Sequence, residues 1–201
     1  MLESLGALGL AFSGWPSVAS LKALRQLAKA SNASRTLIGF GNPLLDGPNA
    51  GYAELANKAR SNQSCPNAPE QRVAAVTAIG RGVLPLALRG GLADVTQIRL
   101  QVPLPETRDE LCAVAHDLGV RSDEIRLRER ATEGEVKRLS AAGELSKYRL
   151  IHFATHGALA GQIGRDTEPG LLLTPQRSAT EAGDGYLLHR KLPPSNSMPI
   201  G

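Results

Sequence analysis

The dipeptide His156-Gly157 is the part of the sequence best suited to chemistry. It ends the run LIHFATHG, in which residues 150–154 form a near-continuous apolar stretch of strand length. Such runs are typical of strands covered on both faces, and functional side chains in parallel sheets follow the carboxyl ends of strands. An imidazole there can act as a general base or orient a thiolate, and the next N–H can donate to an oxyanion. We therefore predict His156 and Gly157 as catalytic residues, against the plainer alternative that His156 only ends a strand.

A second histidine, His152, lies four residues before His156. On a helix this spacing can bind a metal, but the pair lacks the glutamate of H-E-x-x-H and falls on a predicted strand. A histidine of the sheet is therefore favoured over a metal ligand. The phosphate-binding patterns G-x-x-x-x-G-K-[ST] and G-x-G-x-x-G do not occur. We predict no metal and no cofactor.

The sequence contains two cysteines, and neither is placed like a nucleophile. Cys112 lies in a predicted helix beside its apolar face, where cysteine usually acts as a small buried hydrophobe. Cys65 lies in the loop sequence SNQSCPNAP, which has no strand to fix a thiol. Without a C-x-x-C spacing or a recognisable secretion signal, we expect both cysteines to be reduced and intracellular. Four further polar residues receive no role: Asp46, Asp166, Asp184 and His189.

The composition of the chain argues against a membrane span and against nucleic-acid binding. The chain has 201 residues, of which 42% are hydrophobic and 21% charged, without an apolar run near the ~20 residues of a membrane span. The net charge of +4 comes from 23 basic and 19 acidic residues that are interspersed, so no basic patch indicates nucleic-acid binding. The opening MLESLGALGLAF lacks a basic n-region and a typical cleavage site. We expect a cytoplasmic protein that binds neither nucleic acid nor membrane.

Short apolar runs and capped helices alternate along the chain. The predicted strands are residues 36–40, 124–127, 150–154 and 170–174, and residues 95–102, which begin within an otherwise ambiguous segment, alternate in a strand-like way. Two helices are predicted to open at capping boxes, Thr107 with Glu110 and Thr132 with Glu135, and the first is predicted to end at Gly119. Helical spacing is also present after Ser17 and over residues 71–79. This alternation predicts an α/β class with a mostly parallel sheet.

Several of these segments together resemble a known family. The run LIHFATHG is preceded by WPSVASLKAL, TLIGFGNP, LPETRDEL and ATEGEVKRL and is followed by EPGLLLTP and DGYL. In this order, over residues 7–187, they resemble the CHAT domain, a caspase-like domain often fused to TPR repeats. The resemblance implies a caspase-like fold, cysteine-endopeptidase activity on protein or peptide substrates, and catalytic roles for His156 and Gly157.

The resemblance ends where the nucleophile is expected. After D-G-x-L the family continues through a helix and a strand ending in a motif close to S-A-C-N-T, which carries the catalytic cysteine. Here the pattern stops after Leu187, and residues 188–201 look like an aberrant, disordered tail. We therefore expect a sheet that is incomplete at the C-terminus and a truncated peptidase that is inactive as it stands. Frameshift, truncation and a genuine short protein stay open.

The alternative function is a non-catalytic interaction module or an unstable fragment. A parallel sheet without its later strands would leave an unpaired edge and exposed apolar side chains. A protein partner is then expected either at that edge or through TPR repeats upstream of the domain.

Overall fold

The computed structural model describes residues 32–62, 64–66, 83–86, 88–158 and 168–188. The chain divides into two units, Met1–Asn32 and Ala33–Gly201, and the account below concerns the second. The helical segments predicted after Ser17 and over residues 71–79 lie outside the described residues. The same is true of residues 189–201 of the predicted tail, whereas its first residue, Leu188, is fully buried in a strand.

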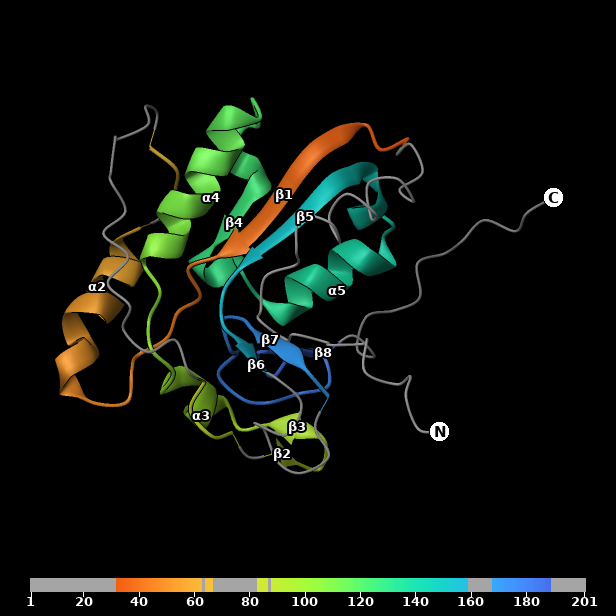
Figure 1. The fold of residues 1–201 in the computed structure, drawn as a ribbon. Coiled ribbons are helices and arrows are strands. Elements are labelled where there is room, and N and C mark those ends of the chain that lie inside the picture. Colours follow the sequence, from red (N-terminus) through yellow and green to blue (C-terminus); the bar gives the residue numbers. More distant parts are fainter. Residues whose placement is uncertain (1–31, 63, 67–82, 87, 159–167, 189–201) are drawn as a thin grey trace, which may run out of the picture. The chain divides into compact units, whose positions relative to one another are not determined.

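The centre of the second unit is a parallel sheet with the strand order β4-β1-β5 (Figure 1). Its strands are β1 (Arg35–Gly41), β4 (Ile125–Leu127) and β5 (Tyr148–Ala154). In the middle of the sheet, Gly39 of β1 lies opposite Ile125 on one side and His152 on the other. The parallel sheet and its flanking helices confirm the predicted α/β, caspase-like class.

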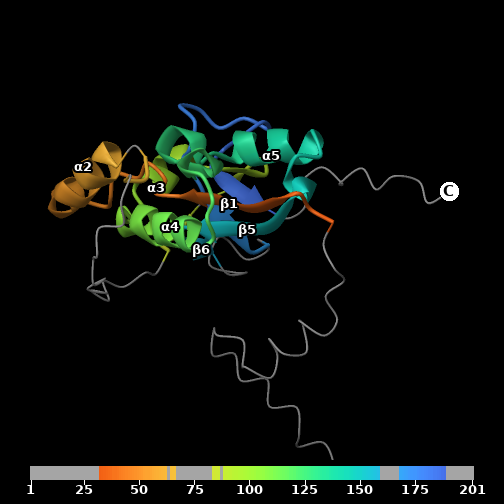
Figure 2. The same cartoon turned by 90° about the horizontal axis from the view of Figure 1, so that it is seen from above.

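Helices cover the sheet on opposite faces. Figure 2 shows α4 (Glu106–Asp117) on one side of β1 and β5 and α5 (Glu133–Ala141) on the other. Leu37 of β1 packs with Leu111 of α4, whereas the next residue, Ile38, packs with Val136 and Leu139 of α5. Neighbouring side chains of a strand point to opposite faces, so the apolar run of β1 supplies both cores.

The glycines of β1 allow α4 to approach the sheet closely. A Cβ atom on Gly41 would lie 2.5 Å from Cδ1 of Leu111, and one on Gly39 would lie 2.9 Å from Cδ2 of the same side chain. The sequence GFG therefore places Phe40 against the α5 side and leaves room for Leu111 on the α4 side.

A smaller antiparallel sheet follows the parallel one along the chain. It consists of β6 (Gly157–Ala158), β7 (Gly170–Leu172) and β8 (Tyr186–Leu188) in that order. The described residues also contain a two-stranded hairpin of β2 (Leu88–Arg89) and β3 (Leu92–Ala93). The remaining elements are α2 (Ala53–Ser61), α3 (Val95–Arg99), η1 (Ala50–Tyr52), η2 (Ser122–Glu124), η3 (Arg128–Arg130) and η4 (Leu145–Lys147).

The strand-like interpretation of residues 95–102 is wrong, because α3 occupies the first part of this segment. The side chain of Asp94 accepts hydrogen bonds from the backbone N–H groups of Thr96 and Gln97, which caps the helix. This cap outweighs the alternating pattern, and Ile98 is the buried residue of α3.

Of the two predicted helix starts, one is confirmed. Thr132 is the N-cap of α5 and accepts from the N–H of Glu135 at 3.1 Å. Thr107 instead lies inside α4, where its hydroxyl donates to the carbonyl of Leu104 and accepts from the N–H of Asn42, both at 2.8 Å. Thr107 therefore joins α4 to the end of β1 and does not cap the helix.

The expectation that the apolar run of β5 is covered on both faces is wrong at its first two residues, Leu150 and Ile151. Leu150 is 50% exposed and Ile151 is 43% exposed. Among the described strands, β5 pairs with β1 alone and so forms the edge of the parallel sheet. Because the two side chains are consecutive, apolar surface is exposed on both sheet faces at this edge.

A charged cluster lies at the amino-terminal end of the sheet. The hydroxyl of Tyr148 donates to Oε2 of Glu124 at 2.5 Å, and the guanidinium of Arg35 lies 2.7 Å from the other carboxylate oxygen. Burial of the phenol, together with its hydrogen bond to Glu124 and the negative charge of that residue, raises the pKa of Tyr148 to about 12.

This cluster predicts a loss of stability at high pH. Because the pKa of Tyr148 is raised from about 10 in the unfolded chain, its contribution is complete below pH ~10 and is lost as the pH rises towards ~12. Thermal unfolding measured between pH 8 and 12 should show this decline, and Tyr148→Phe should flatten it. An equally steep decline in the variant would contradict the assignment to Tyr148.

Candidate active site

His156 is buried just beyond the carboxyl end of β5. Nε2 of the imidazole lies 2.7 Å from the backbone oxygen of Val102, and the residue is only 4% exposed. A carbonyl oxygen can only accept, so Nε2 carries the hydrogen, and the lone pair of a neutral ring lies on Nδ1. The backbone thus fixes both the orientation of the imidazole and the nitrogen that could accept a proton.

The backbone around His156 is held by the antiparallel sheet. The carbonyl of His156 accepts from the N–H of Leu172 in β7 at 2.9 Å, and the hydroxyl of Thr155 donates to the carbonyl of Leu172. The histidine therefore lies where the parallel sheet passes into the antiparallel one. Side chain and backbone are both anchored, so the position of the imidazole is fixed.

Gly157 is exposed and begins β6, where it lies opposite Leu171. Its φ angle is outside the left-handed region, and within the described ranges a Cβ atom there would meet only Cδ2 of Leu171, at 4.0 Å. Among the described residues, neither the backbone conformation nor the available space therefore requires a glycine at this position.

The geometry of Gly157 predicts that Gly157→Ala will fold normally. The change should alter the free energy of unfolding by less than about 1 kcal/mol, because the backbone conformation and the available space both accept a methyl group. Gly41→Ala is the matched control and should be clearly destabilised by its clash with Leu111. Urea denaturation of both variants tests the difference, and equal destabilisation would contradict it.

The ends of the neighbouring strands carry two polar residues that the sequence had not singled out. Asn42 follows β1 and Arg128 follows β4, and both have positive φ angles, 48° and 55°. The carbonyl of Asn42 accepts from the N–H of Arg128 at 3.2 Å, and its Nδ2 donates to the carbonyl of Ala59 in α2 at 2.8 Å. The sequence did contain a signal for Asn42, which lies in G-N-P directly after the predicted strand. Asparagine tolerates a positive φ angle better than most residues.

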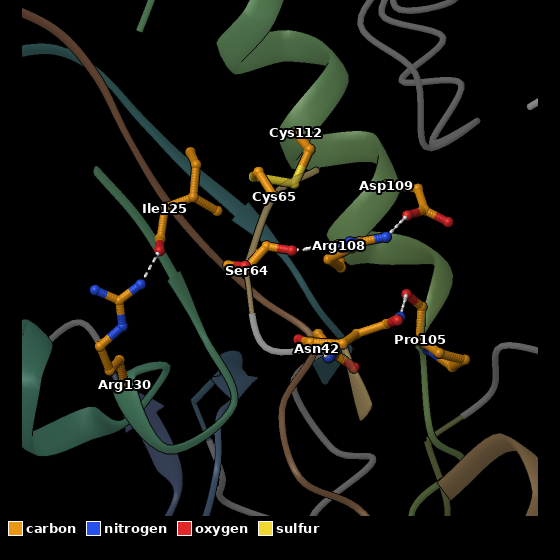
Figure 3. The surroundings of a disulfide bond; sticks show 10 residues. Asn42, Ser64, Cys65, Pro105, Arg108, Asp109, Cys112, Ile125 and Arg130 are labelled. Atoms are coloured by element: carbon orange, nitrogen blue, oxygen red, sulfur yellow. Dashed lines mark hydrogen bonds and ion pairs between the residues drawn. A yellow bond between two sulfur atoms is a disulfide. The ribbon is translucent and has the colours of Figure 1, made fainter. Parts of the chain in front are cut away.

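The two cysteines are joined by a disulfide, so the expectation of two reduced thiols is wrong (Figure 3). Their Cα atoms lie 5.4 Å apart although 47 positions separate them in sequence. Arg108 of α4 donates from Nε and Nη2 to the carbonyl of Ser64 at 3.0 and 2.9 Å, which brings Cys65 back to the helix that carries Cys112. Neither sulfur is a thiolate in this state.

Two other polar candidates have structural partners of their own. His152 lies 3.3 Å from a carboxylate oxygen of Glu110 on α4, as expected for a histidine of the sheet. Asp184 is fully buried and accepts from the N–H groups of Ala93 and Tyr186, both at 2.8 Å, so it joins the β2–β3 hairpin to β8.

Of the remaining two aspartates, Asp46 pairs with Arg60. Asp166 and the fourth histidine, His189, lie outside the described residues. Within the described ranges, no group of three or more His, Cys, Asp or Glu side chains could hold a metal ion.

Comparison with known families gives one match, to a family model described as the CHAT domain, over residues 10–192. No curated protein and no solved structure matches the chain. In the part of the chain that the structure describes, no helix has both the length and the apolar character needed to cross a membrane.

Proposed function

Because the chain belongs to the CHAT domain family, we propose that it derives from a caspase-like cysteine endopeptidase in which His156 is the catalytic base. The buried imidazole held by the carbonyl of Val102 is the observation that carries this proposal. It lies beyond the carboxyl end of a parallel strand, where α/β proteins place functional residues. In the neutral ring the lone pair lies on Nδ1, which is the atom that would accept a proton.

In the complete reaction, a cysteine thiol transfers its proton to Nδ1 of His156 and the thiolate attacks the peptide carbonyl carbon. The N–H of Gly157 stabilises the oxyanion of the tetrahedral intermediate. The imidazolium then protonates the leaving amine as the C–N bond breaks, and water hydrolyses the acyl-enzyme. Protein or peptide substrates follow from this chemistry.

We propose that the chain does not complete this reaction as it stands. Both cysteines of the sequence are consumed in the disulfide, and Cys112 lies in α4 with only 8% exposure. Incubation with a thiol-directed peptidase probe, before and after mild reduction, should give no His156-dependent labelling. Labelling of Cys65 or Cys112 that disappears in His156→Ala would overturn the proposal.

A second candidate function is favoured by the exposed edge of β5. Leu150 and Ile151 point to opposite faces of the sheet, so an added strand would need apolar side chains on both of its faces. The proposed occupant is a parallel strand of this character on a partner polypeptide, such as the cysteine-bearing strand of the family. Strand addition of this kind supplies main-chain hydrogen bonds along the whole edge.

Charged substitutions at this edge test the interaction directly. Leu150→Lys with Ile151→Lys should abolish binding of a synthetic peptide with the S-A-C-N-T-type strand, measured by fluorescence anisotropy, while the fold is retained. A matched pair of lysines at Leu100 and Leu118, which are each 41% exposed and lie outside β5, should leave binding unchanged. Equal binding by the edge variant would exclude the β5 edge as the docking surface.

The cellular location of the protein and its association with other domains are also proposals. A cytoplasmic location and an association with TPR repeats both follow from the family resemblance and the composition. Fractionation of cells expressing the tagged full-length gene product, followed by cross-linking to any TPR-containing polypeptide, tests the two together. Recovery outside the cytoplasm would overturn the first assignment.

A further inference from the structure

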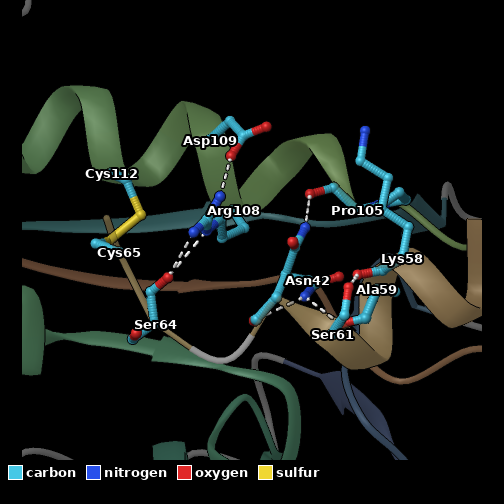
Figure 4. A network of polar contacts seen from close by, with 11 residues as sticks. Asn42, Lys58, Ala59, Ser61, Ser64, Cys65, Pro105, Arg108, Asp109 and Cys112 are labelled. Atoms are coloured by element: carbon cyan, nitrogen blue, oxygen red, sulfur yellow. Dashed lines mark hydrogen bonds and ion pairs between the residues drawn. A yellow bond between two sulfur atoms is a disulfide. The ribbon is translucent and has the colours of Figure 1, made fainter. Parts of the chain in front are cut away.

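We propose that Cys65 and Cys112 are a reversible thiol–disulfide switch that locks the segment formed by Asn62 and residues 64–66 onto α4. This inference does not depend on the chain being a peptidase. It concerns the residues that directly follow α2 and lie beside α4, seen from close by in Figure 4.

Three kinds of tether hold this segment, and all of them lead to α4 or its start. The disulfide joins Cys65 to the middle of the helix. Arg108 donates two hydrogen bonds to the carbonyl of Ser64, at 3.0 and 2.9 Å, and Nδ2 of Asn62 donates to the carbonyl of Pro105 at 3.1 Å. The disulfide is the covalent tether among them, so its state decides how often the segment detaches.

The two sulfurs differ in their access to solvent. Cys65 is partly exposed, whereas Cys112 is 8% exposed and packed on the inner side of the segment. A soluble dithiol can therefore attack Sγ of Cys65, which forms a mixed disulfide and releases the thiolate of Cys112. The second thiol of the reagent then attacks the mixed disulfide. The protein gains two electrons and two protons, and the reductant leaves as a cyclic disulfide.

The remaining tethers make the reverse reaction intramolecular. After reduction, Arg108 and Asn62 still hold the backbone on both sides of residue 63, which keeps Cys65 close to Cys112. A low-molecular-weight disulfide can oxidise Cys65 to a mixed disulfide, and Cys112 then displaces the small thiol. The high effective concentration of the second cysteine favours ring closure.

The locked segment lies against the end of the sheet that carries His156. Nδ2 of Asn42, which follows β1, is 3.5 Å from the carbonyl of Asn62. Pro105, which accepts from Asn62, lies three positions after Val102, whose carbonyl holds His156. Release of this segment would therefore uncover Asn42, which is fully buried in the disulfide state.

The test uses the intact chain equilibrated with graded ratios of reduced and oxidised dithiothreitol. Free thiols are trapped with iodoacetamide and counted by mass spectrometry, while hydrogen exchange and near-ultraviolet circular dichroism are measured in parallel. We expect both cysteines to be alkylated together in a protein that stays folded. Amide exchange in residues 53–66 should rise by about tenfold or more while exchange in β5 stays constant.

Two outcomes would overturn the switch. One is alkylation only under conditions that unfold the whole protein, which would make the disulfide a purely structural bond. The other is unchanged exchange in residues 53–66 after reduction, or in a Cys65→Ser/Cys112→Ser double variant that cannot form the bond.

Arg108 supplies a separate test of reversibility. Arg108→Ala should form the disulfide roughly tenfold more slowly from the reduced state, because the bonds that hold Ser64 are lost. Arg121→Ala, in an arginine with a largely exposed side chain outside α4, is the matched control and should reoxidise at the wild-type rate. Equal rates in the two variants would exclude a positioning role for Arg108.

Discussion

His156→Ala is expected to lower kcat/KM by about 10²–10⁴-fold in a chain that is extended after Leu187 by the helix and S-A-C-N-T-type strand of the CHAT family. The extension supplies the thiol, and the exposed edge of β5 supplies the place for its strand. Without the imidazole, the thiol loses the group that accepts its proton and later protonates the leaving amine. Hydrolysis of fluorogenic peptides, measured for the extended chain and its variant, gives the ratio.

The matched control is His152→Ala in the same extended chain. This histidine lies on β5 itself, four positions before His156, is partly exposed, and lies 3.3 Å from a carboxylate oxygen of Glu110 on α4. The variant should keep kcat/KM within about twofold, because exposed ion pairs contribute little. An equal loss in both variants would mean that the strand is disturbed, and full activity in His156→Ala would exclude it as the base.

The sequence predicted the parts of the sheet that depend on local pattern. The short apolar runs that become β1, β4 and β5 were found because buried strands need little beyond apolar side chains between turn residues. The position of His156 after β5 followed from the same pattern. Thr132 was found as a cap because its interaction with Glu135 spans only three residues.

Features that depend on contacts between distant segments were missed. The disulfide joins positions 47 residues apart, and nothing near Cys65 in sequence shows that Arg108 draws the loop onto α4. Thr107 was assigned to a cap because the bond it accepts from Asn42 crosses 65 positions. The exposure of Leu150 and Ile151 in β5 was missed for the same reason, since a run of apolar residues does not reveal whether another strand lies beside it.

The low aromatic content makes the core sensitive to the loss of one ring. Aromatic residues are 3% of the chain, and Phe40 is completely buried at the centre of the sheet. Its ring stacks on Phe153 of β5 with centroids 5.1 Å apart and an interplanar angle of 15°. Phe40→Ala should therefore lower the free energy of unfolding by about 3–5 kcal/mol, measured by urea denaturation.

Two variants separate cavity formation from the loss of apolar surface in general. Phe40→Leu keeps much of the buried volume beside Val136 and Leu139 and should cost less than Phe40→Ala. Leu150→Ala removes a side chain that is half exposed, so it should change stability by less than about 1 kcal/mol. A large cost at Leu150 would show that the edge of β5 is covered in solution. The ring of Phe40 stacks on Phe153 of β5, which lies three positions before His156. Phe40→Ala should therefore also raise amide hydrogen exchange along β5 under conditions in which the protein stays folded.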